Sequence, residues 1–129
     1  MAQIAIAQLS TWDELHDLPV GSIVRDAEGD EFTKAKDGRF KGIGGLDFSA
    51  FSLAVFAPVA VLNPEILDPS RFRQGDEVEV VRQFFWGIRL GERGEVVGVE
   101  PGINRKLVRV RLHKGGLHFY FTNYEITHV

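Results

Sequence analysis

No cysteine occurs among the 129 residues of the sequence. Disulfides, thiolate-bound zinc, iron–sulfur clusters and thiol catalysis are therefore excluded. The absence fits the reducing cytoplasm, which is where we expect the protein to act. It also removes the usual reinforcements of a very small domain, since about 60 residues without a disulfide or a metal form only a marginally stable core. We therefore expect the two halves of the chain to support each other, or the chain to oligomerise.

Long apolar runs are also missing. The most apolar stretch covers residues 51–62 and contains Pro58, whereas a membrane-spanning helix needs about 20 apolar residues. The first residues of the chain lack the basic segment and the apolar core of a secretion signal. The sequence thus predicts no association with a membrane.

Motifs of catalysis and cofactor binding are absent as well. The sequence contains neither a G-x-S-x-G elbow nor an H-E-x-x-H helix. The glycine-rich segment 42–45 lacks the Gly-Lys-Ser/Thr ending of a phosphate-binding loop. His113 and His118 flank a turn and could approach each other, but no third metal ligand is predicted beside them. We expect no enzymatic activity, no cofactor and no metal.

One acidic segment superficially suggests calcium. Asp26, Glu28 and Asp30 surround Gly29. A calcium-binding EF-hand loop has its glycine later and ends on a bidentate glutamate, and this segment has neither feature. Because Asp and Gly are favoured in turns for backbone reasons, we interpret the segment as the turn of a β-hairpin.

The N-terminal half shows short β-strands separated by turn residues. Thr11 and Glu14 have the capping-box spacing of a short helix that ends before Pro19. Residues 3–9 form either a strand or an extended arm. Strands are predicted over residues 21–26, 31–36, 39–40 and 59–62, with turns at 27–30 and 37–38, a loop at 41–47 and a helical turn at 48–56.

The C-terminal half has a clearer β pattern. Residues 107–112 alternate between apolar and basic side chains, which is the period of a half-buried strand. Strands are predicted over residues 75–81, 94–99, 107–112, 118–121 and 126–129, with a long aromatic loop at 82–93, a type II turn at 100–102, a glycine turn at 114–116 and a 3₁₀ turn at 123–125.

This order of elements resembles an SH3-like β-barrel over residues 71–129. The segment Gly-Asp-Glu-Val-Glu-Val at 75–80 matches its first strand, and Gly-Glu-Val-Val-Gly-Val at 94–99 is similar to the core of a KOW motif. The resemblance implies a small barrel that binds peptides, RNA, DNA or a ribosomal surface.

The N-terminal half resembles a small β domain of uncharacterised actinobacteriophage proteins. The similarity lies in Leu-Pro-Val-Gly-Ser-Ile-Val-Arg-Asp at 18–26, Gly-Asp-Glu-Phe at 29–32, Asp-Gly-Arg-Phe at 37–40 and Phe-Ala-Pro-Val-Ala-Val-Leu at 56–62. Phe32 and Phe40 stand where those proteins often have Trp. The resemblance implies a phage-encoded accessory protein that works in the host cytoplasm or in the virion.

We therefore predict a mostly β protein with two domains, residues 1–66 and 67–129. The second is an SH3-like barrel. The first is a hairpin-rich β domain with short helices, or a second SH3-like barrel, because residues 21–24 and 75–78 begin two halves of similar element order. Charge divides unevenly: residues 1–67 have ten acidic and five basic side chains, a net charge of −5, and residues 68–129 have eight acidic and ten basic ones, a net charge of +2.

The candidate binding surface lies in the C-terminal domain, where loop aromatics and outer-face arginines occur together. Such a surface holds nucleic acids by charge and stacking, or acidic and proline-rich peptides. The predicted function is a non-enzymatic binding module that engages a host or phage protein. The alternatives are nucleic-acid binding through the basic face and a minor structural role in the virion. A plainer interpretation leaves the aromatics in the core and the arginines in solvent. The candidate residues are Phe84, Phe85, Trp86, Arg89, Arg109, Arg111 and Tyr120.

Overall fold

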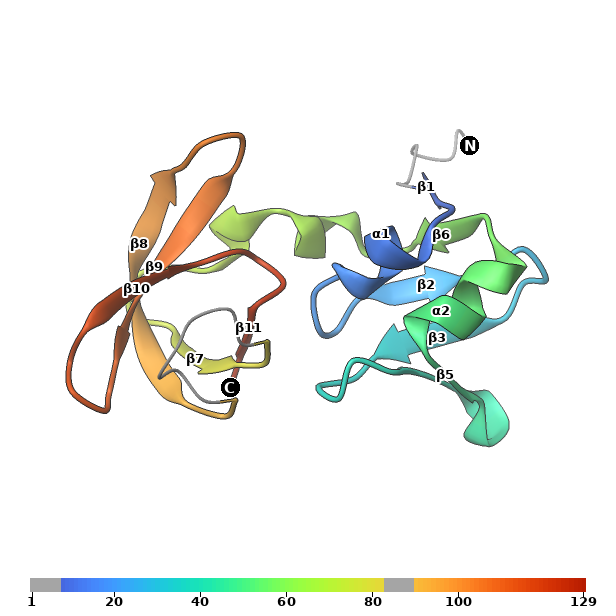
Figure 1. Ribbon diagram of the computed structural model, residues 1–129, viewed down its shortest axis with the longest axis horizontal. Helices are drawn as coiled ribbons and strands as arrows, with labels where there is room; N and C mark the ends of the chain where they lie inside the picture. The colour runs from blue at the N-terminus through green and yellow to red at the C-terminus, as the bar shows by residue number, and fades with distance from the viewer. Residues whose placement is uncertain (1–7, 83–89) are drawn as a thin grey trace. The chain divides into compact units, whose positions relative to one another are not determined.

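The computed structural model describes residues 8–82 and 90–129. The chain divides into two compact units, Met1–Ile66 and Leu67–Val129, each with its own antiparallel sheet and its own apolar core (Figure 1). The prediction of a mostly β protein with a few short helices is confirmed. None of the helices in the described ranges is long and apolar enough to cross a membrane.

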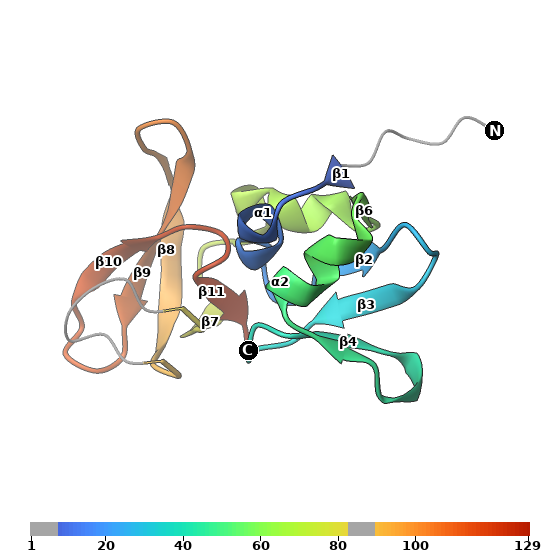
Figure 2. The same ribbon diagram turned by 45° about the vertical axis from the view of Figure 1, so that its right-hand side comes forward.

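The first unit contains a six-stranded sheet in the order β1-β6-β2-β3-β4-β5. Its helices α1 and α2 pack against each other and lie beside each other in two views of the molecule (Figures 1 and 2). The strands are β1 (Gln8–Leu9), β2 (Ile23–Arg25), β3 (Glu31–Lys34), β4 (Phe40–Gly42), β5 (Asp47–Phe48) and β6 (Val59–Val61). The helices are α1 (Trp12–His16), α2 (Ala50–Leu53) and the 3₁₀ turns η1 (Ile43–Gly45) and η2 (Ala54–Phe56).

The capping box of the first helix and the acidic turn at residues 27–30 form as the sequence predicts. The Glu14 carboxylate accepts the backbone N–H groups of Ser10 and Thr11 at 3.1 and 3.2 Å, as a capping box requires. The Asp26 carboxylate accepts the N–H groups of Glu28 and Asp30 at 3.0 and 2.9 Å. The acidic segment is therefore the turn of the β2–β3 hairpin. The Asp26 carboxylate stabilises that turn by accepting hydrogen bonds from its backbone.

The predicted loop over residues 41–47 is wrong. The segment is a third hairpin, in which β4 continues to Gly42 and β5 returns at Asp47. Gly42 pairs with Phe32, and a Cβ at Gly42 would lie 3.0 Å from the Phe32 ring. The glycine that suggested a loop is instead required for the close approach of a neighbouring side chain. Of residues 3–9, Gln8 and Leu9 pair with β6, and the rest lie outside the described residues.

Among the described residues of the first unit, one cation, Lys34, is buried in the core. Lys34 follows Phe32 by two residues, so both side chains point to the same face of β3. The Lys34 ammonium donates to the carbonyls of Leu15 and His16 in the last turn of α1 and of Leu18 just after it. The apolar members of this core are Leu15, Leu18, Val24, Phe32, Phe40, Ala50, Leu53, Val59 and Val61.

The second unit contains a five-stranded sheet in the order β10-β9-β8-β7-β11. The connector before it forms two 3₁₀ turns, η3 (Pro64–Leu67) and η4 (Pro69–Arg71). The strands are β7 (Glu77–Val80), β8 (Arg93–Pro101), β9 (Lys106–Leu112), β10 (His118–Phe121) and β11 (Ile126–His128). The core consists of Phe72, Val78, Val80, Val96, Val108, Val110, Leu112, Phe121 and Ile126.

The type II turn predicted at residues 100–102 is wrong. Strand β8 continues through Pro101, which pairs with Lys106, and the chain reverses over residues 102–105. Gly102 donates its N–H to the Arg105 carbonyl at 2.8 Å, and Asn104 takes the left-handed conformation with φ 70°. Asparagine tolerates that conformation better than most residues. The chain therefore reverses at residues 102–105, two residues later than the predicted turn that begins at residue 100.

Apart from β1 at the edge of the first sheet, the two sheets have the same strand order. In the first unit β6 pairs with β2, which begins the meander β2-β3-β4-β5; in the second unit β11 pairs with β7, which begins the meander β7-β8-β9-β10. A helical or turn segment precedes the returning strand in both: α2 and η2 before β6, and the turn closed by Glu125 N–H on Thr122 before β11. Within the described ranges both sheets remain open, with two edge strands each.

Candidate functional site

Three of the predicted binding residues lie on one face of the second sheet. Arg109 and Arg111 alternate with the buried Val108 and Val110 on β9, and Tyr120 is directly opposite Arg109 on β10. The period of a strand puts all three side chains on the outer face. The other predicted residues, Phe84, Phe85, Trp86 and Arg89, lie outside the described residues.

Each arginine of this face has a glutamate partner from β8. Nη2 of Arg111 lies 2.9 Å from Oε1 of Glu95, which is its direct cross-strand neighbour. Nη1 of Arg109 lies 3.6 Å from Oε1 of Glu100. The two arginines and two glutamates have no net charge together. The surface predicted to be basic is therefore a mixed-charge surface.

Arg109 connects two further groups of the face. Its Nε donates to Nδ1 of His118 at 2.9 Å, and its guanidinium lies 5.9 Å from the centre of the Tyr120 ring, within the range of a cation–π contact. The Tyr120 hydroxyl interacts with the Glu100 carboxylate, and that hydrogen bond raises the pKa of Tyr120 above its ordinary 10.0. We call this set the β8–β9–β10 face; its members are Glu95, Glu100, Arg109, Arg111, His118 and Tyr120.

Sequence reasoning missed half of this face. Glu95, Glu100 and His118 were not among the candidates, although the alternation of β8 and β10 could have indicated them. Their pairing depends on the register of β8 against β9, which shifts at a bulge between Val96 and Gly98. A one-residue change of register moves every side chain to the opposite face, so the sequence alone did not identify the partners.

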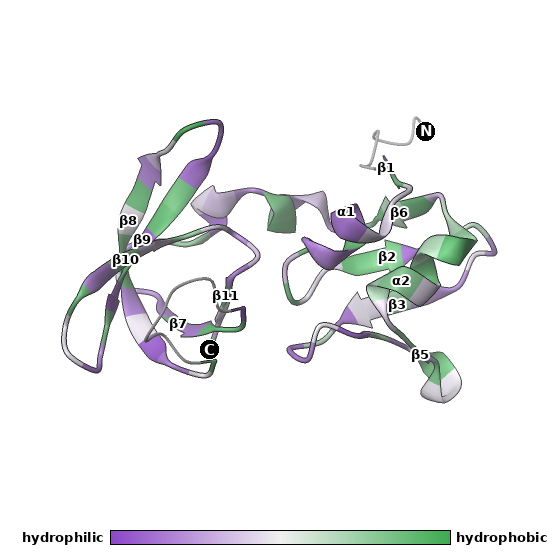
Figure 3. Cartoon of the chain, in the orientation of Figure 1, coloured by the Kyte–Doolittle hydropathy of each residue, from purple (hydrophilic) through white to green (hydrophobic). Residues whose placement is uncertain are grey.

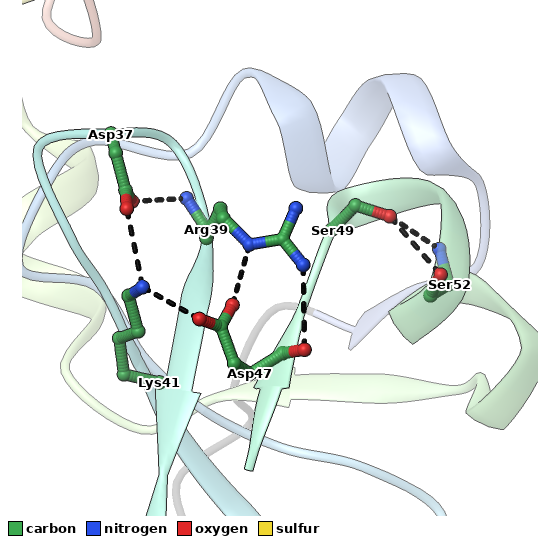
Figure 4. Close-up of polar contacts among 6 residues, drawn as sticks. All are labelled: Asp37, Arg39, Lys41, Asp47, Ser49 and Ser52. Atoms are coloured by element: carbon green, nitrogen blue, oxygen red, sulfur yellow. Dashed lines mark hydrogen bonds and ion pairs between the residues drawn. The ribbon is translucent and has the colours of Figure 1, made fainter. Parts of the chain in front are cut away.

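A second polar cluster ties the β4–β5 hairpin together (Figure 4). The Lys41 ammonium lies 2.7 Å from one Asp47 oxygen and 3.2 Å from an Asp37 oxygen. Nε of Arg39 donates to the other Asp47 oxygen at 2.5 Å. The pKa values of Asp47 and Asp37 are lowered, by the Lys41 hydrogen bond first for Asp47 and by the Arg39 N–H first for Asp37. Two cations thus neutralise two carboxylates on an exposed surface, where such networks support a hairpin.

A third cluster involves the end of the chain. His128 stacks on Phe72 with ring centres 4.5 Å apart, and its Nε2 lies 2.9 Å from Oδ2 of Asp76. Its Nδ1 lies 3.5 Å from Nη1 of Arg71. Arg71 also donates through Nε to the Asn123 side chain at 2.9 Å, and burial lowers the pKa of Arg71 to about 10. Both imidazole nitrogens have partners, so this Asp–His pair fastens β11 rather than presenting a free base.

The two histidines that were considered as a pair have different partners. His118 accepts from Arg109, whereas Nε2 of His113 lies 2.6 Å from Oε2 of Glu77. Across residues 8–82 and 90–129, no group of three or more His, Asp or Glu side chains is arranged to hold a metal ion. Comparison with known proteins finds no matching family model, no similar curated protein and no similar solved structure.

Proposed function

We propose that the chain is a non-enzymatic binding module that engages a protein partner through the β8–β9–β10 face. The strand order of the second unit supports the related proposal that it is built on an SH3-like plan, since its last strand pairs with its first and the other strands follow as a meander. The same order in the first unit supports a tandem of two such units.

The pairing of the two arginines is the observation that carries this proposal. A surface that binds a phosphate backbone needs uncompensated positive charge, whereas Arg109 and Arg111 each have a glutamate partner. Tyr120 is 43% exposed beside them. Tyrosine and arginine surrounded by polar groups are typical of the centre of a protein–protein interface. Nucleic-acid binding is therefore the less favoured alternative.

The resemblance of the first unit to actinobacteriophage proteins suggests where the partner comes from. We propose that the protein is a phage accessory protein and that its partner is a host or phage protein. Actinobacterial cells are accordingly the material from which to isolate the partner. A minor structural role in the virion is the alternative, and it would require association with virion proteins rather than with a protein of the uninfected host.

The experiment compares the wild-type chain with Tyr120→Ala and with the pair Glu95→Gln plus Glu100→Gln. Proteins captured from actinobacterial lysate are identified, and the dissociation constant of each purified candidate is measured. Loss of an exposed tyrosine in an interface should weaken binding by more than about fivefold. Equal affinity of wild type and Tyr120→Ala for every captured protein would exclude this face.

The glutamine pair tests the nucleic-acid alternative on the same face. It removes two negative charges and leaves both arginines without an acidic partner. If the face serves nucleic acid, affinity for single- or double-stranded DNA or RNA should be measurable in wild type, fall steeply with salt, and rise in the glutamine pair. No binding at low salt by either protein would eliminate that alternative and leave the protein-binding proposal standing.

A further inference from the structure

The first unit contains a hollow of about 470 Å³ at the side of its sheet. One wall is the β2–β3 turn, and the other is the tip of the β4–β5 hairpin, where η1 lies. In the hydropathy colouring this tip is green and white, although it lies at the free end of a hairpin (Figure 3). The lining residues are Gly29, Asp30, Glu31, Ile43 and Leu46.

The apolar wall of the hollow is unusually exposed. Ile43 is 89% exposed and Leu46 is 38% exposed, so the rest of the unit leaves Ile43 almost uncovered and covers Leu46 only in part. Gly44 and Gly45 have φ values of 72° and 83°, and this backbone reversal presents the two side chains at the tip of the hairpin. Covering aliphatic side chains in this position with a ligand removes apolar surface from water, which favours binding.

The polar wall of the hollow carries two carboxylates, Asp30 and Glu31. Glu31 is already paired with Arg25 at 2.8 Å. The Asp30 carboxylate has no cation within ion-pair distance in the part of the chain that the structure describes. Arg39 and Lys41, the cations of the adjacent hairpin, are occupied by Asp47 and Asp37. Residues 1–67 as a whole carry a net charge of −5.

We propose that this hollow docks a basic segment of a protein partner, in which a lysine or arginine alternates with an apolar residue. Charge complementarity identifies the occupant. The ammonium or guanidinium group pairs with Asp30, and the aliphatic stem and the neighbouring apolar side chain cover Ile43 and Leu46. Long basic side chains bury their stems on apolar surface in this way while the charged end stays at a polar rim. The surface belongs to the first unit, so the proposal is independent of the β8–β9–β10 face.

The test uses the full chain and three capped hexapeptides: a Leu-Lys repeat, a Leu-Glu repeat and a Ser-Lys repeat. Amide NMR spectra locate the binding site, and the same titrations give the affinities. We expect the Leu-Lys peptide to shift the amide signals of residues 29–31 and 43–46. The Leu-Glu peptide should not bind, and the Ser-Lys peptide should bind more weakly because it covers no apolar surface. Affinity for the Leu-Lys peptide should fall as the salt concentration rises.

Two variants and two matched controls separate this site from general attraction to an acidic protein. Asp30→Asn should weaken the Leu-Lys peptide at least about threefold, and Ile43→Ser should weaken it about tenfold. Glu65→Gln and Val55→Ser remove an exposed charge and a 74% exposed apolar side chain elsewhere in the same unit. These controls should remain within about twofold of wild type.

Several results would overturn the proposal. One is the absence of binding at millimolar peptide. Another is a pattern of shifts spread over the acidic surface without a maximum at the hollow. Equal affinity for the Leu-Lys and Ser-Lys peptides would mean that charge alone is recognised. An equal loss of affinity for the Leu-Lys peptide in Asp30→Asn and Glu65→Gln would likewise mean that the peptide recognises only the overall negative charge. All four side chains are exposed, so unchanged spectral dispersion in the free variants shows that they remain folded.

Discussion

The imidazole Nε2 of His128 lies 2.9 Å from Oδ2 of Asp76 and joins the last strand of the second unit to the turn before β7. The same Asp76 oxygen accepts the backbone N–H of Arg73 at 2.8 Å. These two hydrogen bonds, the Arg73 N–H first and His128 second, hold the pKa of Asp76 below its ordinary 3.8. One carboxylate thus stabilises both a turn and the closing strand pair.

The first prediction concerns acid stability. A carboxylate with a lowered folded-state pKa stabilises the fold at every pH above its unfolded value, and that contribution is lost as the pH falls through the folded-state value. Asp76→Asn should therefore lower the free energy of unfolding by about 0.5–1 kcal/mol at pH 7. The difference between variant and wild type should shrink as the pH falls below about 4.

Urea unfolding of both proteins at a series of pH values measures this difference directly. Subtracting the two curves removes the contributions of the other carboxylates, which are common to both proteins. A difference that stays constant from neutral to strongly acid pH would show that the Asp76 charge does not stabilise the fold.

The second prediction concerns the buried Lys34. Replacing it by methionine keeps the apolar stem but removes the ammonium hydrogen bonds to the carbonyls of Leu15, His16 and Leu18. The Leu15 carbonyl still accepts the Leu18 N–H. Hydrogen bonds to a charged group contribute more than neutral ones, so the loss of three of them in Lys34→Met should lower the stability of the first unit by at least about 2 kcal/mol. Lys36→Met, two residues along the chain at an exposed position, should change stability by less than about 1 kcal/mol, because the polar contacts of an exposed lysine contribute little. Similar unfolding midpoints for both variants would contradict the prediction.

The third prediction compares two glycines of the same strand. A Cβ at Gly94 would lie 2.6 Å from the Arg111 carbonyl oxygen and 2.7 Å from Cγ1 of Val110, whereas a Cβ at Gly98 meets nothing within 4 Å. Gly94→Ala should cost about 1–3 kcal/mol, because β8 and β9 must move apart. Gly98→Ala should be within about 0.5 kcal/mol of wild type. Thermal unfolding of the two variants decides the point, and an equal effect would mean that β9 is not so closely placed.

The fourth prediction tests the β8–β9–β10 face without a partner. The Glu100 carboxylate raises the pKa of Tyr120, so Glu100→Gln should return that pKa toward 10.0. Absorbance titration of the phenol group measures it, in a Tyr124→Phe background that leaves Tyr120 as the one tyrosine, since the sequence contains two. A titration curve identical with and without Glu100 would show that the two side chains are not hydrogen-bonded.

Local features of this fold could be predicted from the sequence because they depend on neighbours within a few residues. The capping box of Thr11 and Glu14 and the left-handed Gly29 and Gly38 turns are of this kind. Predictions from single residue types were less successful. Gly42 suggested a loop and Pro101 a turn, yet both are in strands, because pairing with a distant strand outweighed the local preference.

The alternation of residues 107–112 determined by itself that Arg109 and Arg111 face outward. The pattern of short strands and turns determined a β-rich chain, and the composition determined an acidic first half and the absence of cysteine chemistry. Only the tertiary structure decided what those arginines contact. Their glutamates come from another strand whose register depends on a bulge, and Lys34 is buried because a helix end sixteen to nineteen residues earlier supplies three carbonyls. Side-chain direction follows from backbone period, which is local. Pairing depends on which segments the apolar core brings together, and that depends on the whole chain.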